Sequence, residues 1–169
     1  MKVINLFSGP GAGTSTTAAQ LYAELKWAGI NCEMVREWIK EKVWQGEANE
    51  SLSNQLYVFA KQHNGLYNIN NKVDYAITDS PLPLSIIYNK QKDSLFDSLV
   101  IHEFNKFNNI NIFLTRNKPY SGSGRYQTLE EAQVLDEKIK NLLRQYALPY
   151  TIIEGTNEAT KFIRKILGV

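Results

Sequence analysis

The chain has 169 residues, of which 43% are hydrophobic and 21% charged, and its formal net charge at pH 7 is +2. These values are ordinary for a soluble globular protein with one core, and they exclude binding to nucleic acid through overall charge, although a local basic patch is compatible with them. The single Cys32 excludes an internal disulfide framework and a cysteine-rich metal site. Neither a signal peptide nor an apolar stretch of membrane-spanning length is recognisable, so we expect a cytoplasmic protein with no membrane partner.

Short apolar runs alternate with helical patterns along the chain. The runs predicted to be strands lie at 2–7, 31–35, 73–79, 110–115 and 150–154. Helices are predicted at 15–29, from about 38, at 52–69, in mixed segments up to about 107, at 129–146 and at 159–167. Strands connected by helical crossovers predict a five-stranded parallel sheet covered on both faces. We therefore expect a single α/β domain over residues 1–169, with ligands beyond the carboxyl ends of the strands.

The glycine-rich segment SGPGAGTST at 8–16 joins the first strand to the first helix. Backbone amides in such a turn, together with the start of a helix, bind phosphate. We therefore expect this segment to hold ATP, with the hydroxyl of Ser15 or Thr16 on Mg²⁺. The residues expected to contact the nucleotide are Gly9, Pro10, Gly11, Ala12, Gly13, Thr14, Ser15 and Thr16.

The segment departs from the P-loop pattern G-x-x-x-x-G-K-[ST]. Aligned on Gly13, it has Ser8 at the first glycine and Thr14 at the lysine, although the spacing and the strand-loop-helix context agree. This context favours a three-layer P-loop NTPase fold of the nucleotide-kinase type. The alternative is a glycine-rich turn that binds no ligand.

Charged residues follow the second and third predicted strands. An arginine can grip an acceptor phosphate through two hydrogen bonds, and a carboxylate can accept the proton of an attacking hydroxyl. We expect Arg36 and Lys40 to bind the substrate. Glu37 or Asp79 would accept the proton, and Asp79 would also join Ser15 in holding Mg²⁺. The alternatives are a solvated charge pair at 36–37 and an aspartate that caps the next helix.

The segment RNKPYSGSGRYQ at 116–127 follows the fourth strand and has no periodicity. We expect a mobile basic lid loop at about 116–127 that closes over the triphosphate and carries Arg116, Lys118 and Arg125. Arg116 and Arg125 would neutralise charge on the transferred phosphoryl group and replace the lysine missing at Thr14. An ordinary basic surface loop is the alternative.

Residues on the predicted helices carry weaker signals. Gln55 and Gln62 are amides near the cleft that can read a base edge, unless they belong to a solvated face. His63 and His102 stand alone and are not expected to be ligands. We expect Trp44, Tyr57 and Phe59 in the core, and one face of the helix over 52–69 formed by Leu52, Leu56, Phe59 and Ala60.

These motifs resemble those of small P-loop kinases that act on nucleosides and nucleotides. VREW at 35–38 is similar to the TREP sequence after the second strand of thymidylate kinases, and DSPLPLSIIYN at 79–89 loosely resembles their DRY..S..AYQ. NQLYVFAKQ at 54–62, ITDSPL at 77–82 and the segment at 116–127 resemble a set of phage-encoded ATPases over nearly the whole chain. The glycine-rich loop also resembles the loop of some archaeal adenylate kinases that lack the lysine, which implies that a kinase can function without it.

The resemblance implies transfer of the ATP γ-phosphate to a hydroxyl of a nucleotide-type acceptor. Related phage kinases phosphorylate 5-hydroxymethyluracil in DNA, so this modified DNA base is the first expectation for the acceptor, in the host cytoplasm if the chain is phage-encoded. A deoxynucleoside or mononucleotide kinase is a second possibility. A third is a non-catalytic nucleotide-binding protein, which Thr14 favours and the retained Glu37, Asp79 and arginines oppose. The sequence gives no indication of the oligomeric state.

Overall fold

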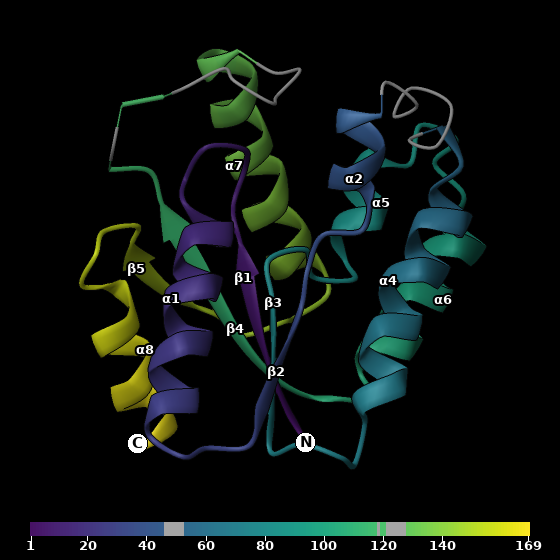
Figure 1. Cartoon of the computed structure of the whole chain (residues 1–169). Helices are drawn as coiled ribbons and strands as arrows, with labels where there is room; N and C mark the ends of the chain where they lie inside the picture. Colours follow the sequence, from purple (N-terminus) through teal and green to yellow (C-terminus); the bar gives the residue numbers. More distant parts are fainter. Residues whose placement is uncertain (46–52, 118, 121–127) are drawn as a thin grey trace.

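The computed structural model describes residues 1–45, 53–117, 119–120 and 128–169, and it contains a five-stranded sheet of order β2-β3-β1-β4-β5 (Figure 1). Every neighbouring pair in this sheet is parallel, as the alternating sequence pattern predicted. The strands are β1 (Lys2–Phe7), β2 (Cys32–Val35), β3 (Tyr75–Thr78), β4 (Asn108–Thr115) and β5 (Thr151–Glu154).

Helices cover both faces of the sheet, which gives three layers (Figure 1). One face carries α1 (Thr14–Trp27) and α8 (Ala159–Leu167). The other face carries α4 (Gln55–Ile69), α5 (Leu84–Tyr88), α6 (Ser94–Phe104) and α7 (Leu129–Gln145). The short α2 (Ile39–Trp44) follows β2, near the carboxyl ends of the strands. Among the helices that are described, none combines the length and the apolar composition that a membrane span requires.

Alternation along β1 explains why the sheet is buried on both sides. Val3 and Phe7 pack into the core beneath α4, α6 and α7, whereas Ile4 and Leu6 pack beneath α1 and α8. A parallel strand that is buried on both faces is apolar at nearly every position, as this one is. Cys32 at the start of β2 is fully buried in the second of these cores, which also contains buried leucines of α1.

The register of the strands decides which residues meet at the carboxyl edge. Val35 of β2 lies opposite Thr78 of β3, so Glu37 and Asp79, which follow these residues, emerge side by side. Phe7 of β1 lies opposite Phe113 of β4, so the loop after β1 emerges beside the end of β4. Both termini lie at the opposite edge of the sheet (Figure 1).

The buried face of α4 differs from the expected one. Its buried residues are Gln55, Phe59, Gln62 and Leu66, whereas Leu56 is 58% exposed and Ala60 is exposed. The helix approaches β2 so closely at Gly65 that an added Cβ would lie 2.7 Å from Cγ1 of Val35. This contact turns the Gln62–Leu66 side of the helix inward, and Leu52 lies outside the described residues.

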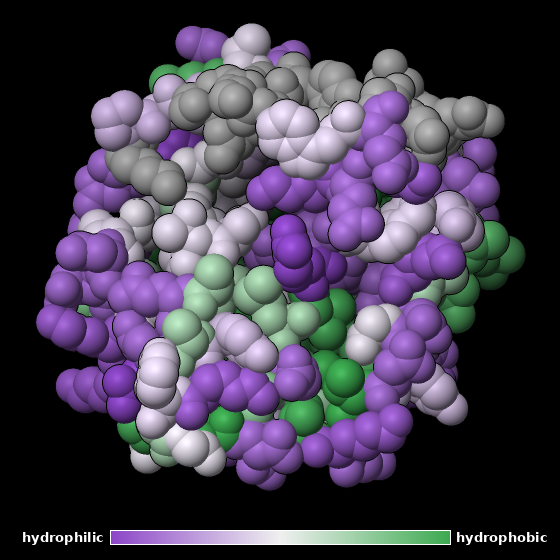
Figure 2. Space-filling view, viewed as in Figure 1, coloured by the Kyte–Doolittle hydropathy of each residue, from purple (hydrophilic) through white to green (hydrophobic). Residues whose placement is uncertain are grey.

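Two aromatic residues expected in the core are exposed. Trp44 is 69% exposed and Tyr57 is 43% exposed, while Phe59 is buried as expected. The ring of Tyr57 packs edge-on against Trp38, with ring centroids 5.1 Å apart. Figure 2, seen from the side of Figure 1, shows a mainly hydrophilic face with apolar residues gathered in its lower half, over β2.

Candidate active site

The glycine-rich loop leads from β1 into α1, as the sequence predicted. Gly11 and Gly13 have φ angles of 84° and 100°, a left-handed conformation that glycine adopts without strain. The helix begins at Thr14, and the first amides of a helix have no partner within it. Among the described residues, none accepts a hydrogen bond from the amides of Gly11, Ala12 or Gly13. The loop therefore presents backbone donors and a helix N-terminus at one point, which is the arrangement that binds phosphate.

Two neighbouring elements hold this loop in place. A Cβ on Gly9 would lie 2.5 Å from the carbonyl oxygen of Ala132 on α7, so only glycine fits there. A Cβ on Gly155, which follows β5, would collide with the carbonyl oxygens of Ala12 and Thr115. Gly155 was not predicted from the sequence to belong to the site, although its position directly after a strand was a signal.

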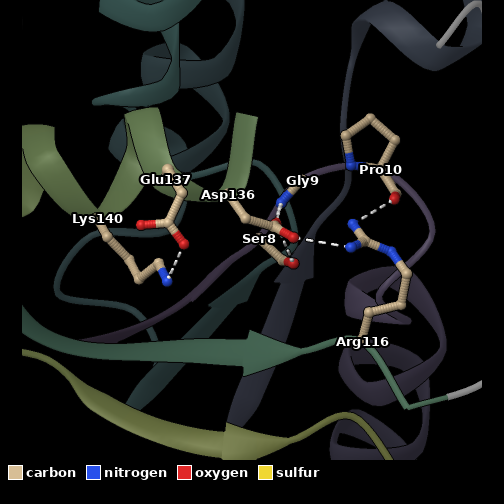
Figure 3. Close-up of polar contacts among 7 residues, drawn as sticks. All are labelled: Ser8, Gly9, Pro10, Arg116, Asp136, Glu137 and Lys140. Atoms are coloured by element: carbon tan, nitrogen blue, oxygen red, sulfur yellow. Dashed lines mark hydrogen bonds and ion pairs between the residues drawn. The ribbon is translucent and has the colours of Figure 1, made fainter. Parts of the chain in front are cut away.

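Asp136 of α7 is the centre of the polar contacts around the loop (Figure 3). Its Oδ1 accepts hydrogen bonds from the Gly9 amide at 2.6 Å and from the Ser8 hydroxyl at 3.3 Å. Its Oδ2 accepts a hydrogen bond from Nη1 of Arg116 at 2.7 Å, and Nη2 of Arg116 donates to the Pro10 carbonyl at 2.8 Å. One carboxylate thus joins the loop to the arginine.

Arg116 contacts the loop directly in this structure. It directly follows β4, and its guanidinium lies against the loop backbone with the side chain only 10% exposed. Its position is therefore fixed by the end of β4, by Asp136 and by the Pro10 carbonyl. Lys118 and Arg125, which were expected to act with it, lie outside the described residues.

Glu37 and Asp79 meet at the carboxyl ends of β2 and β3. The Glu37 amide donates a hydrogen bond to Oδ1 of Asp79 at 2.9 Å. The pKa of the Glu37 carboxyl is raised to about 7, because burial and the negative charge of Asp79 together outweigh the opposing effect of Lys40. Since α5 begins at Leu84 without a side-chain cap, Asp79 does not cap it. Nor is Glu37 a solvated charge, whereas Arg36 is exposed.

Gln62 uses its amide to connect the ends of β2 and β3. Its Oε1 accepts a hydrogen bond from the Trp38 amide at 3.2 Å, and its Nε2 donates to Oγ1 of Thr78 at 3.2 Å. The same hydroxyl accepts a hydrogen bond from the Ser80 amide at 3.2 Å. The buried Gln62 therefore connects the backbone directly after Glu37 to the end of β3, and base recognition by this residue stays a prediction.

Tyr88 of α5 is close enough to both Glu37 and Asp136 to be affected by their charges. Burial and the negative charges of these two residues together raise the pKa of its hydroxyl to about 12. The phenol is therefore neutral at physiological pH. Neither Tyr88 nor Asp136 was singled out from the sequence, because both lie within amphipathic helices whose orientation the sequence does not give.

The residues expected to hold Mg²⁺ supply oxygen ligands of the type that this ion prefers. Ser15 lies in the first turn of α1 and Asp79 follows β3. In the part of the chain that is described, no group of three or more His, Cys, Asp and Glu side chains is arranged to hold a metal ion. An ion here would therefore depend on phosphate oxygens as well as on the protein. His63 pairs with Glu103 at 3.3 Å, which accounts for it without a metal.

The chain is similar to known proteins both in its sequence family and in its fold. Residues 3–160 match the AAA domain family. Thymidylate kinase from Ehrlichia chaffeensis has a TM-score of 0.64 at 14% identity, with 99% of this chain and 98% of that chain covered. Deoxyadenosine kinase from M. mycoides with bound dATP has a TM-score of 0.59 at 18% identity over 100% of both chains. Shikimate kinase from Aquifex aeolicus has a TM-score of 0.56 at 16% identity over 99% and 96%.

A search of curated proteins finds no match. The family match nevertheless spans most of the chain, and the similar structures share its fold over their full lengths. The sheet order and the glycine-rich loop at the start of α1 agree with this result. The chain therefore belongs to the AAA domain family and has an α/β P-loop NTPase fold similar to that of small nucleoside and nucleotide kinases.

Proposed function

We propose that this protein transfers the γ-phosphate of ATP to a hydroxyl of a deoxynucleoside or to a phosphate oxygen of a mononucleotide. One observation carries the proposal: a loop with open backbone donors and a half-buried pair of carboxylates lie at the same edge of the sheet. A loop alone would suit any nucleotide-binding protein. A carboxylate held in a buried position beside a second carboxylate is unfavourable for stability, and it has a use when a proton must be removed.

The loop and its neighbours would hold the nucleotide. Residues 9–16 would surround the phosphates with amide donors, and Arg116 would place a cation beside them. Ser15 and Asp79 would hold Mg²⁺, which supplies positive charge to the phosphate oxygens when it is bound. In this assignment Asp79 keeps its charge for the ion.

Glu37 is the better candidate for the general base. A group with a pKa of about 7 is deprotonated in a large part of the molecules at neutral pH and still binds a proton well. Glu37 would accept the proton of the acceptor hydroxyl as that oxygen bonds to the γ-phosphorus. The bond from this phosphorus to the β–γ bridging oxygen breaks, and ADP leaves with the electron pair. Arg36 and Lys40, close in sequence, would bind an anionic group of the acceptor.

The similar structures favour a small acceptor over a base in DNA. They are a deoxyadenosine kinase, a thymidylate kinase and a shikimate kinase, which are named for small-molecule substrates. The first expectation, 5-hydroxymethyluracil in phage DNA, gains no support from them. A binding protein without turnover remains the competing function, because Thr14 stands where the P-loop lysine is expected.

Labelled ATP can decide among these functions. The protein is incubated with [γ-³²P]ATP, Mg²⁺ and, separately, deoxynucleosides, deoxynucleoside monophosphates, shikimate and hydroxymethylated DNA. We expect label in a deoxynucleoside or a monophosphate, and Asp79→Asn to abolish the transfer without unfolding the protein. Glu33→Gln, a change to an exposed carboxylate of β2, is the matched control and should keep wild-type turnover. Label in DNA alone, or in no acceptor at all, would contradict the proposal.

A further inference from the structure

We propose that Asp136 is a positioning residue that fixes the Arg116 guanidinium on the phosphate loop, where it supplies the cation that Thr14 does not. The inference rests on the proposed function, because it assumes that phosphate binds to this loop. It adds a role for a residue of α7 that lies outside the loop and far from it in sequence.

The Asp136 carboxylate forms a bridge between the phosphate loop and Arg116, because each of its oxygens binds a different one of these two partners. One carboxylate oxygen is bound by the Gly9 amide and the Ser8 hydroxyl, and the other oxygen is bound by Arg116. The Arg116 and Asp136 side chains are 10% and 15% exposed, so solvent screens this pair little. Arg116 in turn donates to Pro10, which closes a ring of contacts between the arginine and the loop (Figure 3). The guanidinium therefore has one position relative to the loop.

Arg116 retains a donor that points to a ligand. Its Nε is buried, and no described residue accepts a hydrogen bond from it. This nitrogen lies 3.8 Å from the position of a Cβ added to Gly11, beside the open amides of the loop. A buried donor without a partner costs about 1–3 kcal/mol, and a phosphate oxygen at this point would remove that cost.

The two departures from the P-loop pattern belong to the same arrangement. Ser8, at the position of the first glycine, gives Asp136 an additional donor. Thr14, at the position of the lysine, leaves a place for positive charge near the loop, and the Asp136 bridge holds an arginine there. A P-loop lysine reaches the phosphates from within the loop, whereas here the cation comes from the end of β4.

A double-mutant cycle tests the bridge. We expect Arg116→Ala to lower kcat/KM at least about a hundredfold, and Asp136→Asn to lower it about tenfold or more, mainly through kcat. If Asp136 acts through Arg116, Asp136→Asn has almost no further effect in the Arg116→Ala background. If Asp136 only ties α7 to the loop, the two losses multiply, and the proposal is wrong.

Three further variants test whether the losses come from the charge of Asp136 and the position of Arg116, and not from any change to α7. Glu137→Gln removes the next carboxylate on α7, which pairs with Lys140, and should leave kcat/KM unchanged. Asp136→Glu keeps the charge and should recover part of the loss seen with Asp136→Asn. Adding Thr14→Lys to Asp136→Asn should also recover activity, because it supplies a cation from within the loop. Failure of both rescues, with thermal stability equal to wild type, would overturn the proposal.

Binding measurements separate this inference from the proposed function. Calorimetric titration with ADP requires no turnover and can be applied to the same four proteins of the cycle. Coupling between Asp136 and Arg116 in ADP affinity, together with no transfer to any acceptor, would refute the kinase and support the bridge. Transfer in the wild type with independent effects of the two changes would support the kinase and refute the bridge.

Discussion

The two halves of the candidate site differ in how their carboxylates are balanced by positive charge. On the phosphate side, which consists of the loop at 8–16 with Arg116 and Asp136, one carboxylate is matched by one guanidinium and by loop donors. On the acceptor side, which consists of Glu37, Asp79 and Gln62, two carboxylates lie together and the pKa of one is raised to about 7. A carboxylate paired with a cation is stabilised in its charged form, whereas a carboxylate beside a second carboxylate has a raised pKa. This difference agrees with the proposed function, in which the first group of residues holds phosphate and the second accepts a proton.

The largest expected effect is the fall in kcat when the carboxylate of Glu37 is removed. Glu37→Gln keeps the size and the amide contact to Asp79 but cannot accept a proton. General-base catalysis contributes about a hundredfold to ten-thousandfold, so we expect kcat to fall by that factor while ADP affinity stays near wild type. Steady-state kinetics and calorimetry measure the two quantities. A variant with more than half of the wild-type kcat would show that the acceptor side does not handle the proton.

A lysine introduced within the loop should make the phosphate side less dependent on its arginine. Thr14→Lys in the Arg116→Ala background should recover about tenfold in kcat/KM, since it replaces the lost cation from another direction. In the wild-type background the same change should alter kcat/KM by less than about threefold, because the cation is already present. Equal gains in both backgrounds would mean that Arg116 does not occupy the role of the missing lysine.

The smallest expected effect concerns stability as a function of pH. The pKa of Glu37 is about 7 in the folded protein against an ordinary value of 4.5, so the folded state binds this proton more tightly than the unfolded state. The stability from this group is fully present below pH 4.5 and is lost as the pH rises through about 7. At about 1.4 kcal/mol per pKa unit, the loss of free energy of unfolding is at most about 3.5 kcal/mol. Urea unfolding in EDTA from pH 5 to 8 should show a smaller decrease for Glu37→Gln than for wild type.

Most of the fold and part of the site follow from sequence patterns. The buried parallel strands are mainly apolar, and most of them are followed by a charged residue or a glycine, so their positions were predicted, although the fourth begins at Asn108, before the predicted boundary. The meeting of Glu37 and Asp79 follows from the rule that parallel strands end at one edge. The loop was recognisable because only glycine tolerates the φ angles at Gly11 and Gly13.

The missed residues are those whose roles depend on how a helix is rotated. Asp136 is one polar residue among many on α7, and only the rotation of that helix brings it to Gly9. Gln62 was read as a residue facing the cleft, because the sequence does not show the close approach of α4 to β2 at Gly65. Helical periodicity gives the faces of a helix, but not which face meets a particular loop.

The single cysteine of the chain gives a way to observe the loop without any substrate turnover. Cys32 is fully buried beside Leu21 and Leu25 of α1, the helix whose first turn belongs to the phosphate loop. Burial also raises the pKa of its thiol, which lowers its reactivity while the protein is closed. A thiol reagent can therefore reach it only when α1 opens away from the sheet. Any ligand that binds the closed loop slows this modification in proportion to its occupancy, so unlabelled compounds can be ranked by the rate at which one sulfur atom reacts.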